Sequence, residues 1–250
     1  MKTEILGISI DCLNQNQVME KIEKKFADFQ KFYIVTVNPE FILTAQKDKK
    51  FAQILNEAEI SIADGIGLVL VSKMTKNKIP KRIAGIDLMM KICEYAEQNQ
   101  KLIYLLGGNM DVAKEAKEEL IKQFPKLIVA GYDSGILANE IWTIEKEKEI
   151  IQKINNSQAD ILFVALGSPK QEKFIAQNLD KLNIKLAMGV GGSFDFIAKK
   201  VPRASRWMQI IGLEWLFRLF KEPRRIKRIF NAVIVFPVTF LFRTFIIKSK

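Results

Sequence analysis

Asp64 is the residue whose surroundings in the sequence point most strongly to chemistry. It lies in the stretch S-I-A-D-G-I-G-L-V-L (residues 61–70), among apolar residues and glycines typical of a buried segment. Burial of an unpaired carboxylate is costly, because desolvation disfavours the charged form. Two interpretations stay open: Asp64 caps a helix that carries residues 68–74, or it acts as a general base.

The residue types that are missing restrict the chemistry. The sequence has no histidine, which excludes Ser-His-Asp and Cys-His catalysis and removes the commonest metal ligand. It has no D-x-D pair, the obvious carboxylate clamp for a divalent metal on a diphosphate. Two distant cysteines without a C-x-x-C motif fit a reducing compartment. We therefore expect no metal and no cofactor, and proton transfer by Asp, Glu, Lys, Tyr or Cys.

The elements that must position these residues alternate along the first 200 residues. Short β-branched runs separated by amphipathic helical stretches are typical of a mostly parallel sheet covered on both faces. This predicts a Rossmann-like α/β core over residues 1–200. The strand-like runs are 4–10, 32–37, 59–63, 102–106, 127–130, 161–166 and 186–190, and the helical stretches include 17–29, 87–98, 112–124 and 144–154.

Polar residues and glycines gather at the carboxyl ends of these runs, where open α/β sheets bind ligands. Plain structural interpretations also fit: Asn38 before Pro39 is a good helix cap, and Gly107-Gly108 suits an ordinary turn. Gly167-Ser168 could bind a phosphate or only cap a helix. Gly65-x-Gly67 lacks the third glycine of a dinucleotide fingerprint, with Leu70 in its place. The predicted site residues are Thr36, Asn38, Asp64, Gly107, Gly108, Gly167, Ser168, Gln171, Gly191 and Gly192.

Residues 201–250 differ in character and are predicted to form a basic amphipathic appendage. From Arg203 to Lys250 there are eleven Lys or Arg and two acids, a net charge of +9 out of +11 for the 250-residue chain. Such asymmetry indicates an anionic partner, and an aromatic-rich apolar face flanked by arginines is typical of an interfacial helix. The apolar run 232–242 contains Pro237 and is too short to span a bilayer. A buried helix pair with a solvated basic face is the alternative.

Several stretches together resemble the WecG/TagA/CpsF glycosyltransferase family. They are T-V-N-P-E-F (36–41), A-D-G-I-G (63–67), R-I-A-G-I-D (82–87), L-G-S-P-K-Q-E (166–172), G-V-G-G-S-F-D (189–195), and G-L-E-W-L-F-R-L with E-P-R-R-I-K-R in the tail. They occur in family order over nearly the whole chain. Arg203-Ala204-Ser205 departs from the family's more frequent R-A-P, which affects only the expectation for that local turn.

The resemblance implies an inverting, metal-independent transfer of N-acetylmannosamine from UDP to undecaprenyl-diphosphate-linked N-acetylglucosamine, in wall teichoic acid linkage-unit synthesis. It implies Asp64 as the base and Arg82 near the reacting centre, with Thr36, Asn38 and Gln171 holding the sugars. Tail arginines Arg218, Arg225 and Arg228 would meet the lipid diphosphate. The N-terminus lacks an apolar signal segment, so we expect a cytoplasmic protein bound peripherally to the inner face of an anionic membrane.

Rival interpretations stay open at this point. The same reaction could use another UDP-sugar, such as UDP-ManNAcA, for a different surface polysaccharide. A soluble dehydrogenase-like enzyme is disfavoured by the incomplete glycine fingerprint. A non-catalytic α/β protein could bind nucleic acid or membrane through the tail, although the aromatic and aliphatic content of the tail favours lipid over nucleic acid. The exact sugar, the lipid length and the oligomeric state, a homo-oligomer included, are left open.

Overall fold

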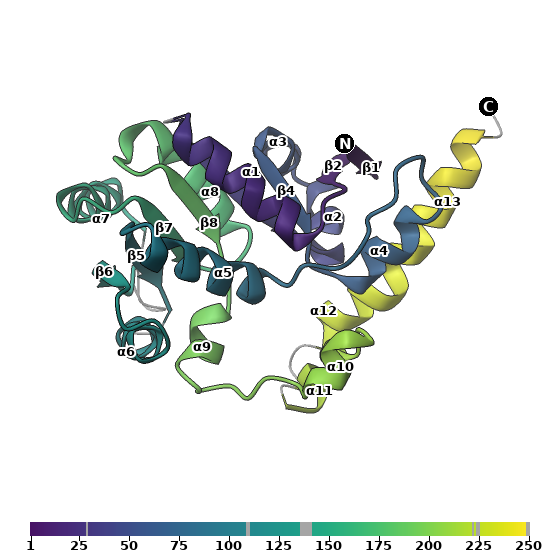
Figure 1. Ribbon diagram of the computed structural model, residues 1–250. Helices are drawn as coiled ribbons and strands as arrows, with labels where there is room; N and C mark the ends of the chain where they lie inside the picture. Colours follow the sequence, from purple (N-terminus) through teal and green to yellow (C-terminus); the bar gives the residue numbers. More distant parts are fainter. Residues whose placement is uncertain (29, 109–110, 136–141, 222, 224–225, 249–250) are drawn as a thin grey trace. The chain divides into compact units, whose positions relative to one another are not determined.

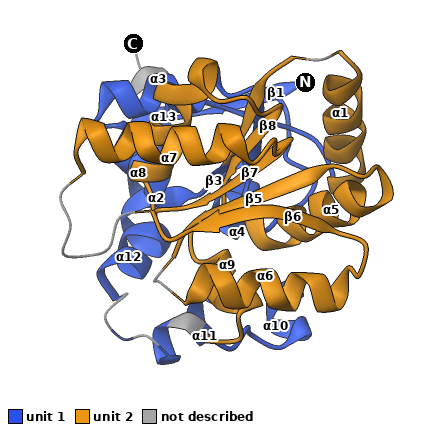
Figure 2. Ribbon diagram, turned by 90° about the vertical axis from the view of Figure 1, so that its left-hand side faces the viewer, with its two compact units in different colours: residues 1–14, 36–84, 202–250 blue, residues 15–35, 85–201 orange. Residues whose placement is uncertain are grey.

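The computed structural model describes residues 1–28, 30–108, 111–135, 142–221, 223 and 226–248, without the side chains of residues 210, 218 and 245–248 (Figure 1). The chain forms two compact units (Figure 2). Unit 1 comprises residues 1–14, 36–84 and 202–250, and unit 2 comprises residues 15–35 and 85–201.

Six strands form a mostly parallel sheet, as the sequence predicts. The strand order is β4-β3-β8-β7-β5-β6, and the pairs β3–β8, β8–β7, β7–β5 and β5–β6 are parallel. Near-continuous apolar residues in β3, β5 and β7 match burial on both faces, whereas the edge strand β6 has no buried residue. The bounds are β3 Phe32–Val37, β4 Ile60–Ala63, β5 Leu102–Gly107, β6 Ile128–Asp133, β7 Ile161–Ala165 and β8 Leu186–Gly189.

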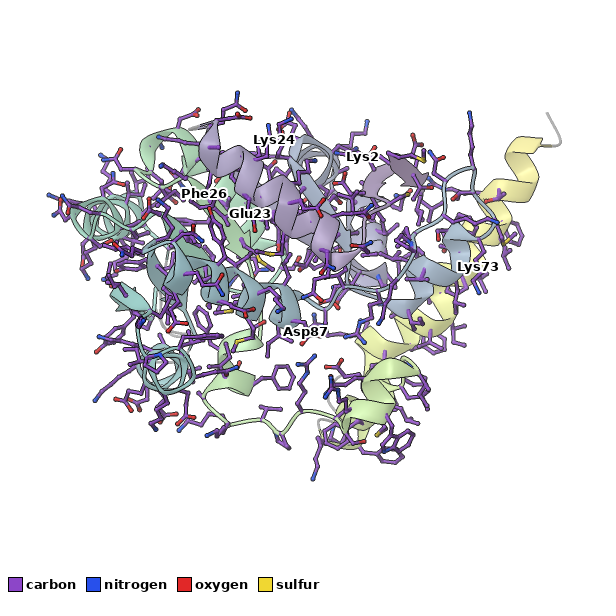
Figure 3. The ribbon with its side chains drawn as sticks, viewed as in Figure 1. Lys2, Glu23, Lys24, Phe26, Lys73 and Asp87 are labelled. Atoms are coloured by element: carbon purple, nitrogen blue, oxygen red, sulfur yellow. The ribbon has the colours of Figure 1, made fainter. Side chains whose placement is uncertain are left out.

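In unit 2, helices cover both faces of the strands. The chain moves from β5 outward to β6 through α6, and back past β5 to β7 through α7. Right-handed crossovers in opposite directions place α6 and α7 on opposite faces, as Figure 2 shows. Helix α1 buries Val18, Ile22 and Phe26 and exposes Glu23 and Lys24 (Figure 3). The helices are α1 Gln15–Ala27, α5 Gly85–Gln98, α6 Val112–Gln123, α7 Ile144–Asn156, α8 Lys170–Asn178 and α9 Ser193–Ile197, with a 3-10 turn at Leu179–Lys181.

Unit 1 begins with a hairpin where the sequence predicts one strand over residues 4–10. Strands β1 (Lys2–Ile5) and β2 (Ile8–Asp11) pair antiparallel. Leu6 and Gly7 between them both have positive φ, 50° and 81°. This is the geometry of a tight two-residue hairpin turn, so the single-strand prediction is wrong. The unit continues with α2 Pro39–Ala45, α3 Lys49–Glu57 and α4 Ile66–Ser72.

The C-terminal segment adds a helical appendage to unit 1. It contains α10 Arg206–Ile210, α11 Glu214–Lys221, α12 Ile226–Phe230, a π-helical turn η3 at Asn231–Val235 and α13 Phe236–Lys248. Residues 226–248 run as one continuous helical stretch, and Pro237 follows the π turn. Proline has no N–H for the helical ladder, and π turns are a common accommodation of such a break.

The appendage packs on α2 and α4, which belong to the same unit. Phe236 and Phe240 are buried on the inner side of α13. None of the described helices has the length and apolar character needed to cross a bilayer. The α/β fold class with a C-terminal helical appendage is confirmed, whereas its association with a membrane stays a prediction.

Candidate functional site

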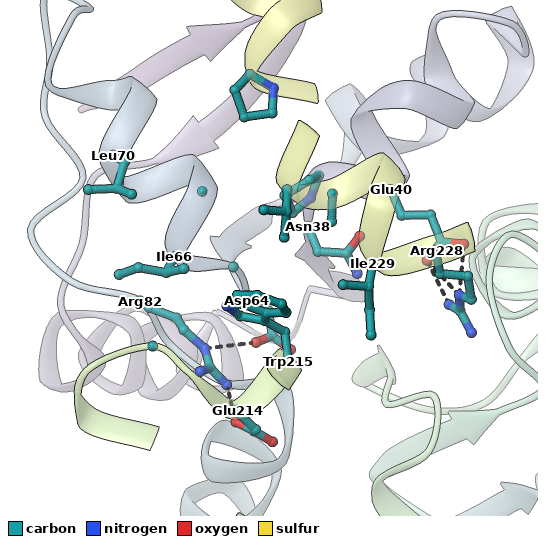
Figure 4. A pocket seen from close by; sticks show the side chains of 17 residues that line it. Asn38, Glu40, Asp64, Ile66, Leu70, Arg82, Glu214, Trp215, Arg228 and Ile229 are labelled. Carbon is teal, nitrogen blue, oxygen red and sulfur yellow. Dashed lines mark hydrogen bonds and ion pairs between the residues drawn. The ribbon is translucent and has the colours of Figure 1, made fainter. Parts of the chain in front are cut away.

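A pocket of about 390 Å³ lies in unit 1, where the ends of β3 and β4 meet the appendage. Its volume is in the range of small-molecule sites. Four residues singled out in the sequence line it: Asn38, Asp64, Arg82 and Arg228 (Figure 4). The other lining residues are Pro39, Glu40, Gly65, Ile66, Gly67, Leu70, Gly212, Glu214, Trp215, Ile229, Ala232, Val233 and Pro237.

Asp64 directly follows β4, and its backbone N–H donates to Val37 O at 2.7 Å. The position expected for a helix cap is taken by Gly65, which is the residue that precedes α4. The carboxylate of Asp64 instead accepts from Arg82 Nε at 3.3 Å and is 27% exposed. Asp64 is therefore not the cap of α4 but a partly exposed carboxylate in the wall of a pocket.

Arg82 lies between two carboxylates. The chain around it runs beside β4, because Ile83 N–H donates to Ala63 O at 3.0 Å. Its Nε faces Asp64, and its Nη2 donates to Glu214 at 2.7 Å. Burial lowers the pKa of Arg82, but Asp64 and then Glu214 outweigh it, so that the pKa is raised. The guanidinium therefore stays charged at the edge of the pocket.

Asn38 has the structural role that its position before Pro39 suggests. Its side-chain oxygen accepts from Phe41 N at 3.1 Å and caps α2. The same side chain lines the pocket, so the cap also fixes the orientation of the Asn38 amide there. Thr36 lies two residues earlier, buried in β3, and is not one of the residues that line the pocket.

The tail arginines are only partly described. Arg228 in α12 makes a bidentate ion pair with Glu40 at the pocket rim. The side chain of Arg218 and the whole of Arg225 lie outside the described residues. Of the three predicted diphosphate ligands, Arg228 is thus the one that the structure places at the pocket.

The remaining predicted residues belong to unit 2 and are described within it. Gly107 (φ 108°) ends β5, and a Cβ there would lie 2.5 Å from Ala165 O. The N–H of Gly108 donates to the same carbonyl at 3.1 Å. This close approach of two strands explains Gly107 without any ligand, in agreement with the plain interpretation of the sequence.

Gln171 joins two loops of unit 2. Its Oε1 accepts from Gly191 N at 3.0 Å, and its Nε2 donates to Glu172 at 2.6 Å. Both side chains are buried, and burial raises the pKa of Glu172 to about 7 despite the hydrogen bond from Gln171 that lowers it. Gly192 precedes α9, and Gly167 and Ser168 are exposed before α8. Gln171 thus orders the loop that carries Gly191 and Gly192.

Three charged residues of these sites were missed from the sequence: Glu40, Glu172 and Glu214. Glu214 carried a signal, because it is one of two acids in a strongly basic tail. Its partner lies 132 residues earlier, so spacing alone could not pair them. Within the described part of the chain, no group of three or more Cys, Asp or Glu could hold a metal ion.

Comparison with known proteins places these motifs in a family. The model of the "Glycosyl transferase WecG/TagA/CpsF family" matches residues 3–249. Curated relatives include a protein of Bacillus subtilis strain 168, 34% identical over 92% of this chain and 88% of its own length. Another, from Staphylococcus aureus strain MRSA252, is 31% identical over 91% of this chain and 88% of its own length.

A third relative, from Bacillus spizizenii strain W23, is 35% identical over 80% of this chain and 75% of its own length. All three bear the name N-acetylglucosaminyldiphosphoundecaprenol N-acetyl-beta-D-mannosaminyltransferase. The similarity extends through both units and into the helical appendage.

Proposed function

This chain belongs to the glycosyl transferase WecG/TagA/CpsF family, and from that premise we propose that it transfers N-acetylmannosamine from a UDP donor to an N-acetylglucosaminyl-diphosphoundecaprenol acceptor. Family membership makes it a glycosyltransferase. The names of its relatives support the choice of acceptor and sugar. The UDP carrier, the inverting course and the independence from metal are further parts of the proposal, as is a role in wall teichoic acid linkage-unit synthesis.

The observation that carries the proposal is the pocket in which Asp64 meets Arg82. A transferase that inverts by direct displacement needs one base on the acceptor side and positive charge for the departing diphosphate. Asp64 is partly exposed in the pocket wall, and Arg82 and Arg228 supply positive charge beside it. Asp64 is thus suited to accept the proton of the acceptor hydroxyl, and the two arginines are suited to stabilise the departing diphosphate.

In the proposed reaction, the acceptor hydroxyl oxygen forms a bond to the anomeric carbon of the donor sugar. The bond from that carbon to the diphosphate oxygen breaks, and UDP leaves with the electron pair. Asp64 takes the proton of the hydroxyl, while arginine side chains stabilise the charge on the diphosphates. The Asn38 amide, fixed by its capping bond, is suited to hold a sugar hydroxyl or acetamido group.

We also propose that the appendage meets an anionic membrane at the inner face of the cell membrane. The outer side of residues 226–248 carries an exposed apolar stripe, composed of Phe230, Ile234, Val238, Leu241 and Phe242. Lysines and arginines of the tail give it a net charge of +9. An apolar face together with basic residues is the composition that binds at a lipid surface. This position would bring the pocket to a lipid-linked acceptor.

The test is UDP release from a panel of UDP-sugars with a short-chain lipid diphosphate that carries N-acetylglucosamine. We expect release with UDP-N-acetylmannosamine and little with UDP-N-acetylglucosamine or UDP-ManNAcA. Release should persist in EDTA, because arginines are proposed to do the work of a metal. Preference for UDP-ManNAcA would contradict the donor, and activity that is lost in EDTA and restored by Mg²⁺ would contradict metal independence. Release with none of the donors would contradict the function itself.

A further inference from the structure

Glu214 is a buried carboxylate of the appendage. It is linked to the candidate base Asp64 through the side chain of Arg82, which contacts both. Its side chain is 5% exposed and accepts from Arg82 Nη2 at 2.7 Å, while Arg82 Nε faces Asp64 at 3.3 Å. All three line the pocket in unit 1 (Figure 4). The arrangement is a carboxylate–guanidinium–carboxylate chain that runs from the tail to Asp64.

The position of Glu214 is fixed by tight packing just before α11. Gly212 has φ 79°, and a Cβ at this residue would lie 2.9 Å from the side chain of Ile66 in α4. The N–H of Leu213 donates to Met208 O at 2.8 Å. The turn at Gly212, two residues before α11, therefore lies directly against α4, the helix that follows Asp64. Movement of the tail would move Glu214 relative to Arg82.

The division of Arg82 between two acids has a chemical consequence. Arginine and carboxylate pair most strongly through two parallel N–H···O bonds. A bidentate pair of that kind on Asp64 would stabilise its charged form and weaken it as a base. With Nη2 held by Glu214, Arg82 meets Asp64 through Nε at a longer distance. Among the described residues, the other charged groups that line the pocket around Asp64 are Glu40 and Arg228.

We propose that Glu214 is a positioning residue, which holds Arg82 so that Asp64 keeps the strength of a working base when the appendage is docked. The inference rests on the proposed function and adds to it one residue, Glu214, whose carboxylate sets the contact between Arg82 and Asp64. A plain alternative is that Glu214, in the first turn of α11, only stabilises that helix through its dipole.

The experiment compares Glu214→Gln, Glu214→Asp and the matched carboxylate-to-amide control Glu94→Gln. Glu94 lies in α5 of unit 2, where it pairs with Lys91 at 2.7 Å, and it is not among the residues that line the pocket. The readouts are the pH profile of kcat for UDP release, liposome pelleting, and trypsin cleavage of the tail. All are measured on the full-length chain.

We expect kcat of Glu214→Gln at neutral pH to fall about tenfold, with the acidic limb of the profile about one pH unit lower. Liposome pelleting should stay as in the wild type. Glu214→Asp keeps the charge and should restore part of both kcat and the profile. Glu94→Gln should keep the wild-type profile. Faster trypsin cleavage of the tail in Glu214→Gln, but not in Glu94→Gln, would further support the role of Glu214 in the docked appendage.

The inference would be overturned if the acidic limb of the kcat profile of Glu214→Gln is the same as in the wild type. This holds whether turnover is normal or falls together with liposome binding. If Glu214→Gln does not fold, Glu214→Asp provides the test. Its acidic limb should lie below that of the wild type, by less than in Glu214→Gln, and an unshifted limb would overturn the inference. An inactive wild-type protein would instead overturn the proposed function and the inference with it. An active wild type with an unshifted variant overturns the inference alone.

Discussion

Arg228 and Glu40 form a bidentate ion pair at the rim of the pocket. Arg228 Nε lies 2.9 Å from both carboxylate oxygens of Glu40, and its Nη2 lies 2.7 Å from one of them. The same geometry would serve an arginine that binds a diphosphate. In the structure, Glu40 thus binds the guanidinium of Arg228, the group that is proposed to bind the acceptor diphosphate.

Replacement of Glu40 by Gln should make Arg228 more available to the acceptor. Exposed ion pairs contribute about 0–1 kcal/mol, so we expect the KM for the lipid diphosphate to fall by no more than about fivefold. The measurement is UDP release against acceptor concentration, with Arg228→Ala as the opposite control, for which KM should rise. A higher KM in Glu40→Gln would indicate that Glu40 serves the acceptor site by holding the tail in place.

The exposed apolar stripe should control membrane binding without controlling stability. We expect the double variant Val238→Ser, Phe242→Ser to bind anionic liposomes at least about tenfold more weakly, since burial of one such side chain is worth about 1.5–3 kcal/mol. Both residues are more than half exposed, so thermal unfolding should change little. Co-sedimentation and calorimetry on the same preparations test both expectations.

A matched control is Ile144→Ser, an exposed apolar residue at the start of α7 in unit 2. It should leave liposome binding unchanged. Phe240→Ser, which alters the buried side of α13, should lower the stability of the appendage. Wild-type liposome binding by the stripe variant would leave basic residues alone as the source of membrane affinity.

Glu172 should make the stability of the protein depend on pH. Burial raises its pKa to about 7, above that of an unfolded chain, so the native state binds more protons than the unfolded state between these values. The contribution of Glu172 to the free energy of unfolding should therefore be complete below about pH 4.5. It should fall by about 3 kcal/mol as the pH rises to about 7.

The variant Glu172→Gln should lose this decline. Denaturant unfolding at a series of pH values from 4.5 to 8 provides the measurement, with the wild type beside it. Parallel stability curves for the two proteins would contradict a protonated Glu172 in the native state. Activity should also be followed, because Glu172 holds the Gln171 amide that orders the Gly191 loop.

Much of the fold could be predicted because the sheet leaves a strong pattern in the sequence. Strand β3 begins and ends where its run of β-branched and aromatic residues does, at Phe32 and Val37. Strand β6 extends three residues beyond the predicted end, because Gly131, Tyr132 and Asp133 pair with β5 although they lack a typical strand pattern. The hairpin at Leu6-Gly7 was missed because Leu6 is an unusual residue for positive φ.

The residues that line the pocket were predictable where they follow strands, but not where their position depends on partners that are distant in the sequence. Asp64 and Asn38 follow strands that the sequence marks clearly, and both line the pocket. Glu214 enters the pocket through the packing of the appendage. Glu40 follows Asn38 closely, but its partner Arg228 lies 188 residues later, and no local spacing encodes either pairing. The sequence therefore indicated Asn38, Asp64 and the two arginines Arg82 and Arg228, but not the carboxylates that hold these arginines.

The central claim is that Asp64 takes the proton of the acceptor hydroxyl, and Asp64→Asn tests it most directly. Arg82 keeps its contact with Glu214 in this variant, so the pocket should stay assembled. Turnover, affinity for the UDP donor and thermal unfolding are measured on the same preparation. This separates loss of the base from loss of binding or of folding.

We predict that kcat for UDP release falls by about 10²–10⁴-fold, the usual effect of removing a general base, while donor affinity and thermal stability stay close to the wild type. A variant that retains near-wild-type turnover with the lipid acceptor would contradict the account, because the proton would then have to leave by another route.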